Sequence, residues 1–330
     1  MLFEKFKTFI EENNLVKEKE KLMLGVSGGP DSVFLLIMFS KLKELKKIDF
    51  ITVHFNHSLR KSADREEEFV RNFSKNLNIK FVSEKKEVKK LYKGDSLEQT
   101  ARNLRYDFFL KIARRYKIKK LALAHHKDDL VETVLLRIFR GTGLLGLRAI
   151  LPLSKYKNLT VIRPLLFLEK REILDFLSKN KIPYMVDKSN FENEFLRNKI
   201  RLDILPYLAK TFPNIKENLY NLAVTSSQDY EFISSFATQT LEKLILKETH
   251  QLLEIDLNKL KTLPQGLVNN ILRAAIQRIK GNLRRIELKH IDKLSELIKK
   301  NNDNLSLDIP FLKVIKQSHS LIFKKTPNLT

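Results

Sequence analysis

A six-residue run, Ser27–Ser32 (SGGPDS), combines residue types that together can bind a phosphate-bearing ligand. Gly28 and Gly29 allow the backbone to turn sharply and to approach a ligand closely. The N–H groups of such a turn, and of a helix that begins after it, attract an anion, and the hydroxyls of Ser27 and Ser32 add two donors. The run lacks the G-x-x-x-x-G-K-S/T pattern of a Walker A loop. The sequence therefore predicts a phosphate-binding loop of another kind.

The same loop contains Pro30 and Asp31. A carboxylate beside phosphate groups is unfavourable unless a cation lies between them, so Mg²⁺ binding is the chemistry expected of Asp31. An acidic residue in the first turn of a helix also interacts favourably with the helix dipole. That simpler explanation accounts for an aspartate at this place, but it does not account for the rest of the pattern.

A second polar cluster, His54–Arg60 (HFNHSLR), follows a predicted strand. Two histidines three residues apart could suggest a metal site, but no acidic residue lies within the run. Contacts with an adenosine and with phosphate groups explain this mixture of polar side chains better than metal binding does. His54 is therefore a candidate nucleotide-binding residue.

A third cluster, Ala124–Thr133 (AHHKDDLVET), places two acids at the start of a predicted helix. Asp129 and Glu132 are three residues apart, so they share one face of that helix. They could bind Mg²⁺ or the ammonium group of a cationic substrate, or they could only stabilise the helix N-terminus. The same strand end carries two histidines and a further aspartate: His125, His126 and Asp128. This crowding favours a functional role.

The elements around these clusters alternate between strand and helix. Short apolar runs predict strands, and helical spacing of apolar residues predicts helices. The expected strands are 21–26, 48–55, 79–84 and 120–125, and the expected helices are 31–46, 63–77, 96–116 and 129–139. This alternation predicts an α/β fold, a Rossmann-like, doubly wound parallel sheet covered by helices on both faces. Ligands bind such sheets at the carboxyl ends of the strands, where all three clusters fall.

The pattern changes after Gly146. A helix is expected from about Glu169, and another is expected to run to Leu205, where Pro206 should stop it. A polar, proline-containing stretch at 211–214 is the expected domain boundary.

The expected domains are therefore 1–213, which would carry the nucleotide chemistry, and 214–330. The second domain is predicted to be mostly helical, with a strand or two near its end. The candidate strands are LSLDI, KVIKQ and SLIFK.

Charge and composition narrow the partners. The chain has 62 Lys and Arg against 39 Asp and Glu, a formal net charge of +23, and such an excess repels itself unless a polyanion binds. The basic residues are spread along the chain rather than gathered on one amphipathic helix, which favours nucleic acid over a membrane surface. Neither a bilayer-spanning apolar run nor the apolar stretch of a secretory signal is found. A cytoplasmic location and no membrane partner are expected.

The chain contains no cysteine. Disulfides, Fe–S clusters, Cys-based zinc sites and thiolate nucleophiles are therefore excluded, and so is sulfur transfer through an enzyme persulfide.

Taken together, the motifs resemble those of the tRNA(Ile)-lysidine synthetases, which are N-type ATP pyrophosphatases. SGGPDS is similar to the pyrophosphate loop of that family, S-G-G-x-D-S. The remaining motifs occur in the family's order and spacing: HFNHSLR, ARNLRY (101–106), AHHKDDLVETVLLRIFRGTGLLGL (124–147), IRPLL (162–166), DKSN (187–190) and RNKIR (197–201), followed by Pro206. The departures are Leu130, where the family often has Gln, and a C-terminal part with room for one domain rather than the two of long forms.

The resemblance implies an adenine nucleotide alpha hydrolase-like fold and a ligase. Such an enzyme joins L-lysine to the cytidine at the first anticodon position of the isoleucine tRNA with a CAU anticodon. ATP first adenylates the ring carbonyl oxygen of the cytidine and releases pyrophosphate. The lysine ε-amine then displaces AMP, and the product, lysidine, makes the tRNA decode AUA. ATP, Mg²⁺, tRNA and lysine are the expected cofactor and partners. Many enzymes of this family form dimers, so the resemblance also implies a homodimer as a possible assembly.

The resemblance also implies roles for individual residues. Residues 27–32 would hold the pyrophosphate, and Asp31 would help to place Mg²⁺. Asp129 and Glu132 would recognise lysine or the metal. Arg105 and Arg197 would lie at the reaction centre, although their convergence depends on the fold.

The basic region Ile215–Thr330 is interpreted as an RNA-binding surface, with its densest cluster at Gln277–His290. The simpler alternative is a solvated helix face.

Three other functions fit parts of the sequence. A tRNA-acting ATP pyrophosphatase that adds sulfur generally uses cysteines or a cluster, and this chain has no cysteine. A small-molecule amidotransferase or ligase of the same fold explains neither the charge of +23 nor the RNKIR segment. An inactive RNA-binding protein that kept the fold is disfavoured by the intact loop 27–32 and by Asp129 and Glu132.

Overall fold

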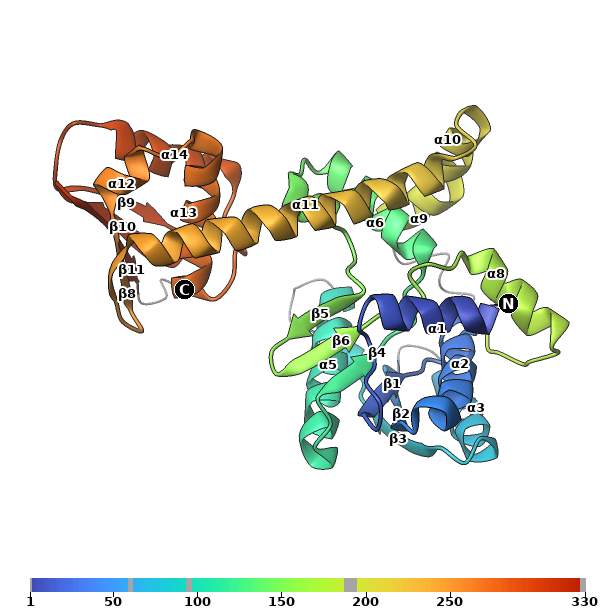
Figure 1. Ribbon diagram of the computed structural model, residues 1–330. Helices are drawn as coiled ribbons and strands as arrows, with labels where there is room; N and C mark the ends of the chain where they lie inside the picture. The colour runs from blue at the N-terminus through green and yellow to red at the C-terminus, as the bar shows by residue number, and fades with distance from the viewer. Residues whose placement is uncertain (1, 59–61, 93–96, 187–194, 327–330) are drawn as a thin grey trace. The chain divides into compact units, whose positions relative to one another are not determined.

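A six-stranded sheet with the order β3-β2-β1-β4-β6-β5 forms the centre of the N-terminal half (Figure 1). The computed structural model describes residues 2–58, 62–92, 97–186 and 195–326. β1 pairs in parallel with both β2 and β4, and β6 pairs in parallel with β4. The strands are β1 Lys21–Gly25, β2 Asp49–Asn56, β3 Lys80–Lys85, β4 Lys120–Ala122, β5 Leu153–Tyr156 and β6 Leu159–Ile162. The predicted parallel sheet is confirmed.

An antiparallel hairpin, β5–β6, closes one edge of this sheet and was not predicted. β4 is also shorter than expected, because it ends at Ala122 instead of His125. The backbone beyond it still follows the sheet, since Leu123 N donates to the carbonyl of Ile162 at 2.9 Å.

Helices cover both faces of the sheet, as the apolar runs of its strands require. On β1, Leu22 and Leu24 face one core together with residues of α1, α2, α6 and α8. Met23 faces the opposite core, which α5 covers (Figure 1). The helices of this half are α1 Leu2–Glu12, α2 Pro30–Lys46, α3 Ala63–Asn76, α4 Val88–Leu91, α5 Leu97–Tyr116, α6 Lys127–Phe139, α7 Leu144–Leu147, α8 Lys170–Lys179, α9 Phe195–Lys199 and α10 Leu205–Thr211.

The expected helix stop at Pro206 is wrong, because the helical run continues to Thr211. Pro206 lies in the first turn of α10, where a missing N–H costs no intrahelical hydrogen bond. A π-helical segment, η2 (Ile200–Ile204), joins α9 to α10. π-helical segments are rare overall, and those that occur often lie near functional sites.

The chain divides into two compact units, Met1–Val224 and Thr225–Thr330. The long helix α11 (Ile215–Leu244) contributes to both cores: Leu219 and Ala223 are buried in the first, and Leu241 and Leu244 in the second. The division therefore falls later than the expected boundary between residues 213 and 214. Pro213 marks only the start of the helix, whose first turns still pack with the first unit.

The second unit combines helices with a five-stranded antiparallel sheet of order β7-β8-β11-β10-β9. The expected helices are present, and the three candidate strands correspond to β9, β10 and β11, whereas β7 and β8 were not predicted. The additional elements are β7 Ile245–Glu248, β8 Leu252–Asp256, α12 Leu257–Lys261, α13 Gln265–Lys280, α14 Leu288–Lys299, β9 Leu305–Ile309, β10 Leu312–Lys316 and β11 Ser320–Lys325.

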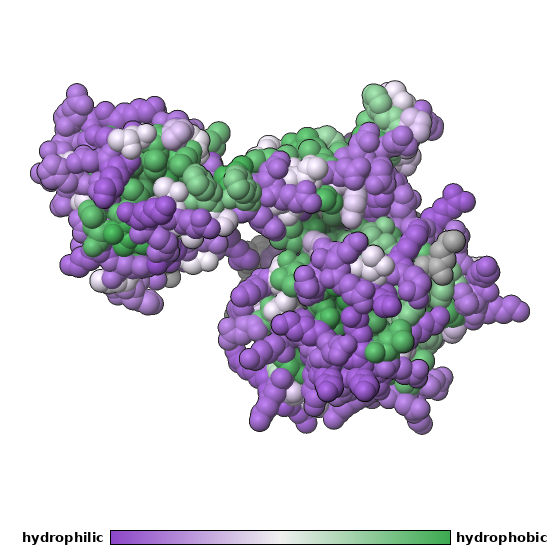
Figure 2. All heavy atoms as spheres, in the orientation of Figure 1, coloured by the Kyte–Doolittle hydropathy of each residue, from purple (hydrophilic) through white to green (hydrophobic). Residues whose placement is uncertain are grey.

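The outer surface is dominated by polar and charged side chains on the face drawn in Figure 2. Among the helices of the described ranges, none combines the length and the apolar character that crossing a membrane requires.

Candidate functional site

The strand order reverses beside β1, with β2 on one side of it and β4 on the other. Such a switch point is where open α/β sheets bind ligands, at the carboxyl ends of the strands. The loop 27–32 follows β1, and the segment 125–132 follows β4. The fold therefore brings the first and third polar clusters together.

Ser32 closes the loop 27–32 on itself. Its Oγ accepts hydrogen bonds from the backbone N–H groups of Ser27 and Gly28, each at 3.2 Å, and donates to the carbonyl of Gly29 at 2.9 Å. Gly28 has a φ of +95°, a conformation that disfavours any residue with a Cβ. Gly29 is the N-cap of α2. The first N–H groups of α2 have no partner within the helix, so the loop ends in a site suited to an anion.

Asp31 lies at the meeting point of three elements. Lys170, the first residue of α8, places its Nζ 2.6 Å from both carboxylate oxygens of Asp31. The Nε2 of His126 lies 3.8 Å from Asp31 Oδ2. No pattern in the sequence distinguished Lys170 from the other lysines, so this contact was missed.

His126 is a buried imidazole surrounded by three carboxylates. Besides Asp31, its ring nitrogens lie 3.5 Å from Asp128 Oδ2 and 3.5 Å from Asp129 Oδ2. Burial alone would lower the pKa of His126, but the charge of Asp129 and the contacts with Asp128 and Asp31 outweigh it, so the pKa is raised. The surrounding carboxylates thus favour the protonated form of His126, which attracts the carboxylates of α2 and α6.

Asp128 has two further hydrogen-bond donors, one of them cationic. Its Oδ2 accepts a hydrogen bond from the backbone N–H of Lys170 at 2.7 Å, and its Oδ1 accepts one from Lys216 Nζ at 2.6 Å. Burial opposes ionisation, but these partners and His126 hold the pKa of Asp128 well below its usual range. Asp128 therefore joins the starts of α6, α8 and α11.

Glu132 is almost completely buried, at 1% exposure, and its carboxylate is hydrogen-bonded to two arginines. Its Oε2 lies 3.1 Å from Arg197 Nε, and Arg201 makes a bidentate contact at 2.6 and 2.9 Å. Arg197 also donates to Thr133 Oγ1 at 3.1 Å. The fold thus brings Arg197 and Arg201 to α6, and the expected place of Arg197 at the reaction centre remains a prediction. A Glu132 engaged in this way is better placed to hold arginines than to receive a substrate ammonium group.

Arg105 reaches the same region from α5. Its charge, together with those of Arg163 and Arg102, acts on His125. Arg163 is itself anchored, donating to the carbonyl of Leu151 at 2.8 Å and to Ser154 Oγ at 2.9 Å. A group of arginines therefore stands beside the end of β4, and the charge of nearby Asp129 opposes their effect on His125.

His54 makes a structural contact. Its Nδ1 lies 2.8 Å from the carbonyl oxygen of Val26, directly before the loop 27–32, and its side chain is buried. Burial lowers its pKa. Asn56 is held by Asp64 and Glu67 at 2.9 and 3.0 Å. The expected contact of His54 with a nucleotide remains a prediction. The end of this cluster, residues 59 and 60, and the DKSN motif at 187–190 lie outside the described residues.

The donor set of the site suits a metal ion that is held partly by a bound substrate. In the described parts of the chain, no three His, Asp or Glu side chains are arranged to hold a metal ion by themselves. Mg²⁺, however, is commonly held by one or two carboxylates together with substrate phosphates and water. Asp31 beside a phosphate-binding loop, with Asp129 close to the same nitrogen of His126, fits that requirement.

His125 should make the fold sensitive to acid. Burial lowers its pKa to about 3 from an ordinary value of 6.5. Between these values the unfolded chain binds a proton that the folded chain does not, so stability should fall as the pH falls from 6.5 towards 3. The cost at the lower limit is on the order of 4 kcal/mol. Urea unfolding across this pH range should show a smaller loss for His125→Asn than for the wild type.

The exposed His250 of the second unit supplies the control. His250→Asn should follow the wild-type profile. An unchanged profile for His125→Asn would show that His125 does not contribute to the acid sensitivity.

Comparison with known proteins adds to this geometry. Residues 2–208 match the PP-loop domain family. The chain is 36% identical over 295 residues to the tRNA(Ile)-lysidine synthase of Clostridium perfringens strain ATCC 13124, covering 88% of this chain and 61% of that protein. It is 31% identical over 329 residues to the tRNA(Ile)-lysidine synthase of Caldanaerobacter subterraneus subsp. tengcongensis, covering 98% and 69%.

A longer protein is also similar. The bifunctional protein TilS/HprT of Listeria innocua is 34% identical over 324 residues, covering 96% of this chain but 49% of that protein. The chain thus spans about half the length of this relative.

Among solved structures, the U34-tRNA thiolase NcsA of Methanococcus maripaludis, with its [4Fe-4S] cluster, superimposes with a TM-score of 0.56 at 17% identity. The match covers 69% of this chain and 78% of the thiolase. This likeness shows a shared fold.

Proposed function

The chain belongs to the tRNA(Ile)-lysidine synthase family of PP-loop proteins, and from this premise we propose that it ligates L-lysine to a tRNA. The target is the cytidine at the first anticodon position of the isoleucine tRNA with a CAU anticodon. ATP is consumed to AMP and pyrophosphate. The observation that carries the proposal is the convergence of a phosphate-binding loop with Asp31, Asp129, Arg197 and Arg201 at one switch point of the sheet.

In the first step, the carbonyl oxygen of the cytidine attacks the α-phosphorus of ATP, and pyrophosphate leaves. The N–H groups of the loop 27–32 would hold the pyrophosphate. Asp31 would hold Mg²⁺, which supplies charge neutralisation at the phosphates when it is bound. Arg197, aligned by Glu132, and Arg105 would stabilise the negative charge that develops in the transition state.

In the second step, the ε-amine of lysine attacks the activated ring carbon, and AMP leaves with the former carbonyl oxygen. A cytosine carbonyl oxygen is a poor leaving group, and its adenylation removes that obstacle. Asp129 is the carboxylate proposed to receive the lysine ammonium group, because Glu132 is bonded to two arginines. The amine must then lose one proton before it attacks.

The partners proposed for the whole chain follow from this reaction. A tRNA supplies the polyanion that a net charge of +23 requires, and the cytoplasm is where tRNA, ATP and free lysine meet. A second copy of the chain is a further proposed partner, to be checked by measuring the mass of the protein in solution.

The proposed function is tested by incorporation of radiolabelled L-lysine into unmodified isoleucine tRNA with a CAU anticodon, in the presence of ATP and Mg²⁺. The CAU methionine tRNA serves as the control. Label in the isoleucine tRNA alone is the expected result. AMP release without label in either tRNA would contradict the use of lysine and would leave only the nucleotide chemistry.

A further inference from the structure

A turn at the end of α13 gathers three basic residues. Gly281 ends the helix with a φ of +89°. The side-chain oxygen of Asn282 then accepts the backbone N–H of Arg284 at 3.0 Å and the Nζ of Lys280 at 3.2 Å. Lys280 also donates to the carbonyl of Arg284. The turn therefore fixes Lys280 next to Arg284 and Arg285.

These residues line a hollow of about 430 Å³, here termed the Lys280 hollow. Its lining consists of cationic, polar and aromatic residues: Lys280, Asn282, Arg284, Arg285, Phe311, Lys325 and Thr326. Four of the seven are cations, and none is an acid. Burial and the charges of Arg285 and Arg284 lower the pKa of Lys280. The cations thus repel one another across the hollow, and a bound anion would reduce this repulsion.

Phe311, which lines the Lys280 hollow, has an unusual backbone conformation. It follows Pro310 in the two-residue turn between β9 and β10 and has a φ of +70°. Turns with a positive φ at this place ordinarily carry Gly or Asn, and a bulky residue there is strained. The ring lies under two cations, 5.0 Å from Lys280 Nζ and 5.8 Å from the guanidinium carbon of Arg285. Such strain concentrates at ligand-binding positions.

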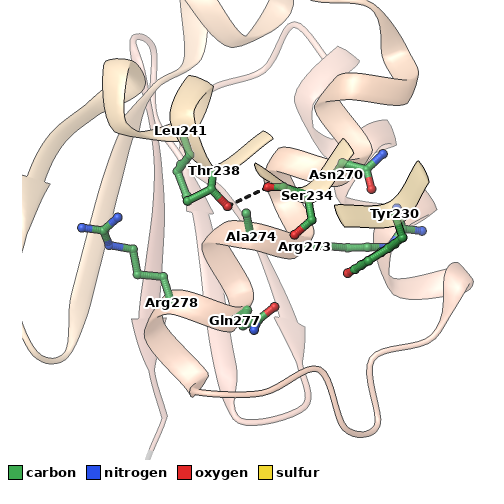
Figure 3. Close-up of a pocket in the computed structure, with 9 residues that line it drawn as sticks. All are labelled: Tyr230, Ser234, Thr238, Leu241, Asn270, Arg273, Ala274, Gln277 and Arg278. Atoms are coloured by element: carbon green, nitrogen blue, oxygen red, sulfur yellow. Dashed lines mark hydrogen bonds between the residues drawn. The ribbon is translucent and has the colours of Figure 1, made fainter. Parts of the chain in front are cut away.

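A second hollow in this unit, about 290 Å³ between α11 and α13, differs in its charge (Figure 3). Arg278 extends away from Ser234 and Tyr230 in that view. Its guanidinium contacts Glu248 at 2.6 and 2.8 Å, and it also contacts Glu242. The charge of Arg278 is therefore already balanced, and Arg273, the other arginine of this hollow, donates to the carbonyl of Asn269 at 3.3 Å. Arg284, Arg285 and Lys325 have no carboxylate partner among the residues that the structure describes.

We propose that the Lys280 hollow binds the phosphodiester backbone of the tRNA. The inference rests on the proposed function, since it assigns a place on the second unit to that substrate. Arginine guanidinium groups match phosphate oxygens with paired N–H donors, and Phe311 holds two of the cations in position for them. RNA is favoured over an anionic membrane, because the hollow is concave and its one apolar side chain lies beneath the cations.

The test measures tRNA affinity of the full chain against salt concentration. A plot of log K against log salt has a negative slope, and each lost phosphate contact should make it less steep by about 1. The double variant Arg284→Gln/Arg285→Gln should therefore make it less steep by about 2. Affinity should fall roughly tenfold or more. Lys90→Gln is the matched control. Lys90 is an exposed lysine of the first unit that pairs with Glu87 at 2.6 Å, so both slope and affinity should stay at the wild-type values.

A second variant separates binding from folding. Phe311→Gly places the preferred residue in the turn, so the thermal midpoint should stay or rise while tRNA affinity falls. A lowered midpoint with unchanged affinity would assign Phe311 a purely structural role and overturn the inference.

An unchanged salt slope in the double variant would also overturn the inference, as would binding to phosphatidylserine vesicles in place of tRNA. The proposed function is tested separately by lysine incorporation in the wild type, whose failure would be seen without any variant.

Discussion

Replacing Asp31 with alanine is expected to reduce release of pyrophosphate from ATP by at least 10²–10³-fold, the range associated with loss of one charge-stabilising group. Asp31 is the acid of the phosphate loop, and Lys170 and His126 hold it in place. Without it, the negative charges of ATP lose their proposed link to Mg²⁺. The measurement is tRNA-dependent pyrophosphate release at saturating ATP.

Asp175→Ala provides the control for this prediction. Asp175 lies on α8 but is 72% exposed, and among the residues that the structure describes it pairs only with the exposed Arg171. Its replacement should leave the rate unchanged. Turnover at the wild-type rate by Asp31→Ala would contradict both the metal role of Asp31 and its place at the reaction centre.

Glu132→Gln is expected to slow pyrophosphate release by roughly 10²–10³-fold even when lysine is absent. The reason is geometric, since Glu132 aligns Arg197 and Arg201 from a buried position. The variant should also lose about 2–3 kcal/mol of unfolding free energy, because strong charge-assisted hydrogen bonds are removed. Rapid-mix measurement of pyrophosphate without lysine, beside urea unfolding, tests both effects.

The alternative role of Glu132 predicts a different result. If Glu132 bound the lysine ammonium group, its replacement would raise the KM for lysine and leave the first step intact. Glu217→Gln is the matched control, because Glu217 is 53% exposed and pairs with Lys127 outside this arginine pair. It should change neither step.

The sheet could be predicted because its information is local. Each strand of the first unit that carries the site is a short apolar run, and each following helix has regular apolar spacing. The meeting of Asp31 with Asp129 follows from the same pattern, since the carboxyl ends of neighbouring parallel strands lie at one edge. The hairpin β5–β6 and the strands β7 and β8 were not predicted. β5 and β7 are largely exposed, so they lack the apolar run that marks a buried strand.

The ion pairs could not be predicted. Lys170 is 139 residues from Asp31 in the chain, and Arg201 is 69 residues from Glu132. Nothing local marks one lysine or arginine among 62 as the partner of a given acid. The structural contact of His54 with Val26 was missed for a related reason. A polar side chain at a strand end looks the same whether it binds a ligand or a neighbouring backbone carbonyl.

The π-helical segment η2 has a consequence for insertions and deletions. A π turn holds one residue more than an α turn, so η2 is equivalent to a single inserted residue between α9 and α10. Deleting one residue from Leu202–Ile204 would convert the π turn into an α turn, so the helices on either side would keep their relative phase. In a regular α-helix the same deletion would rotate everything after it by about 100°. Leu205, which is buried at 5% exposure, would therefore stay in the first core. The π segment thus makes the spacing from Arg201 to Leu205 tolerant of a one-residue deletion that a regular helix would not accept.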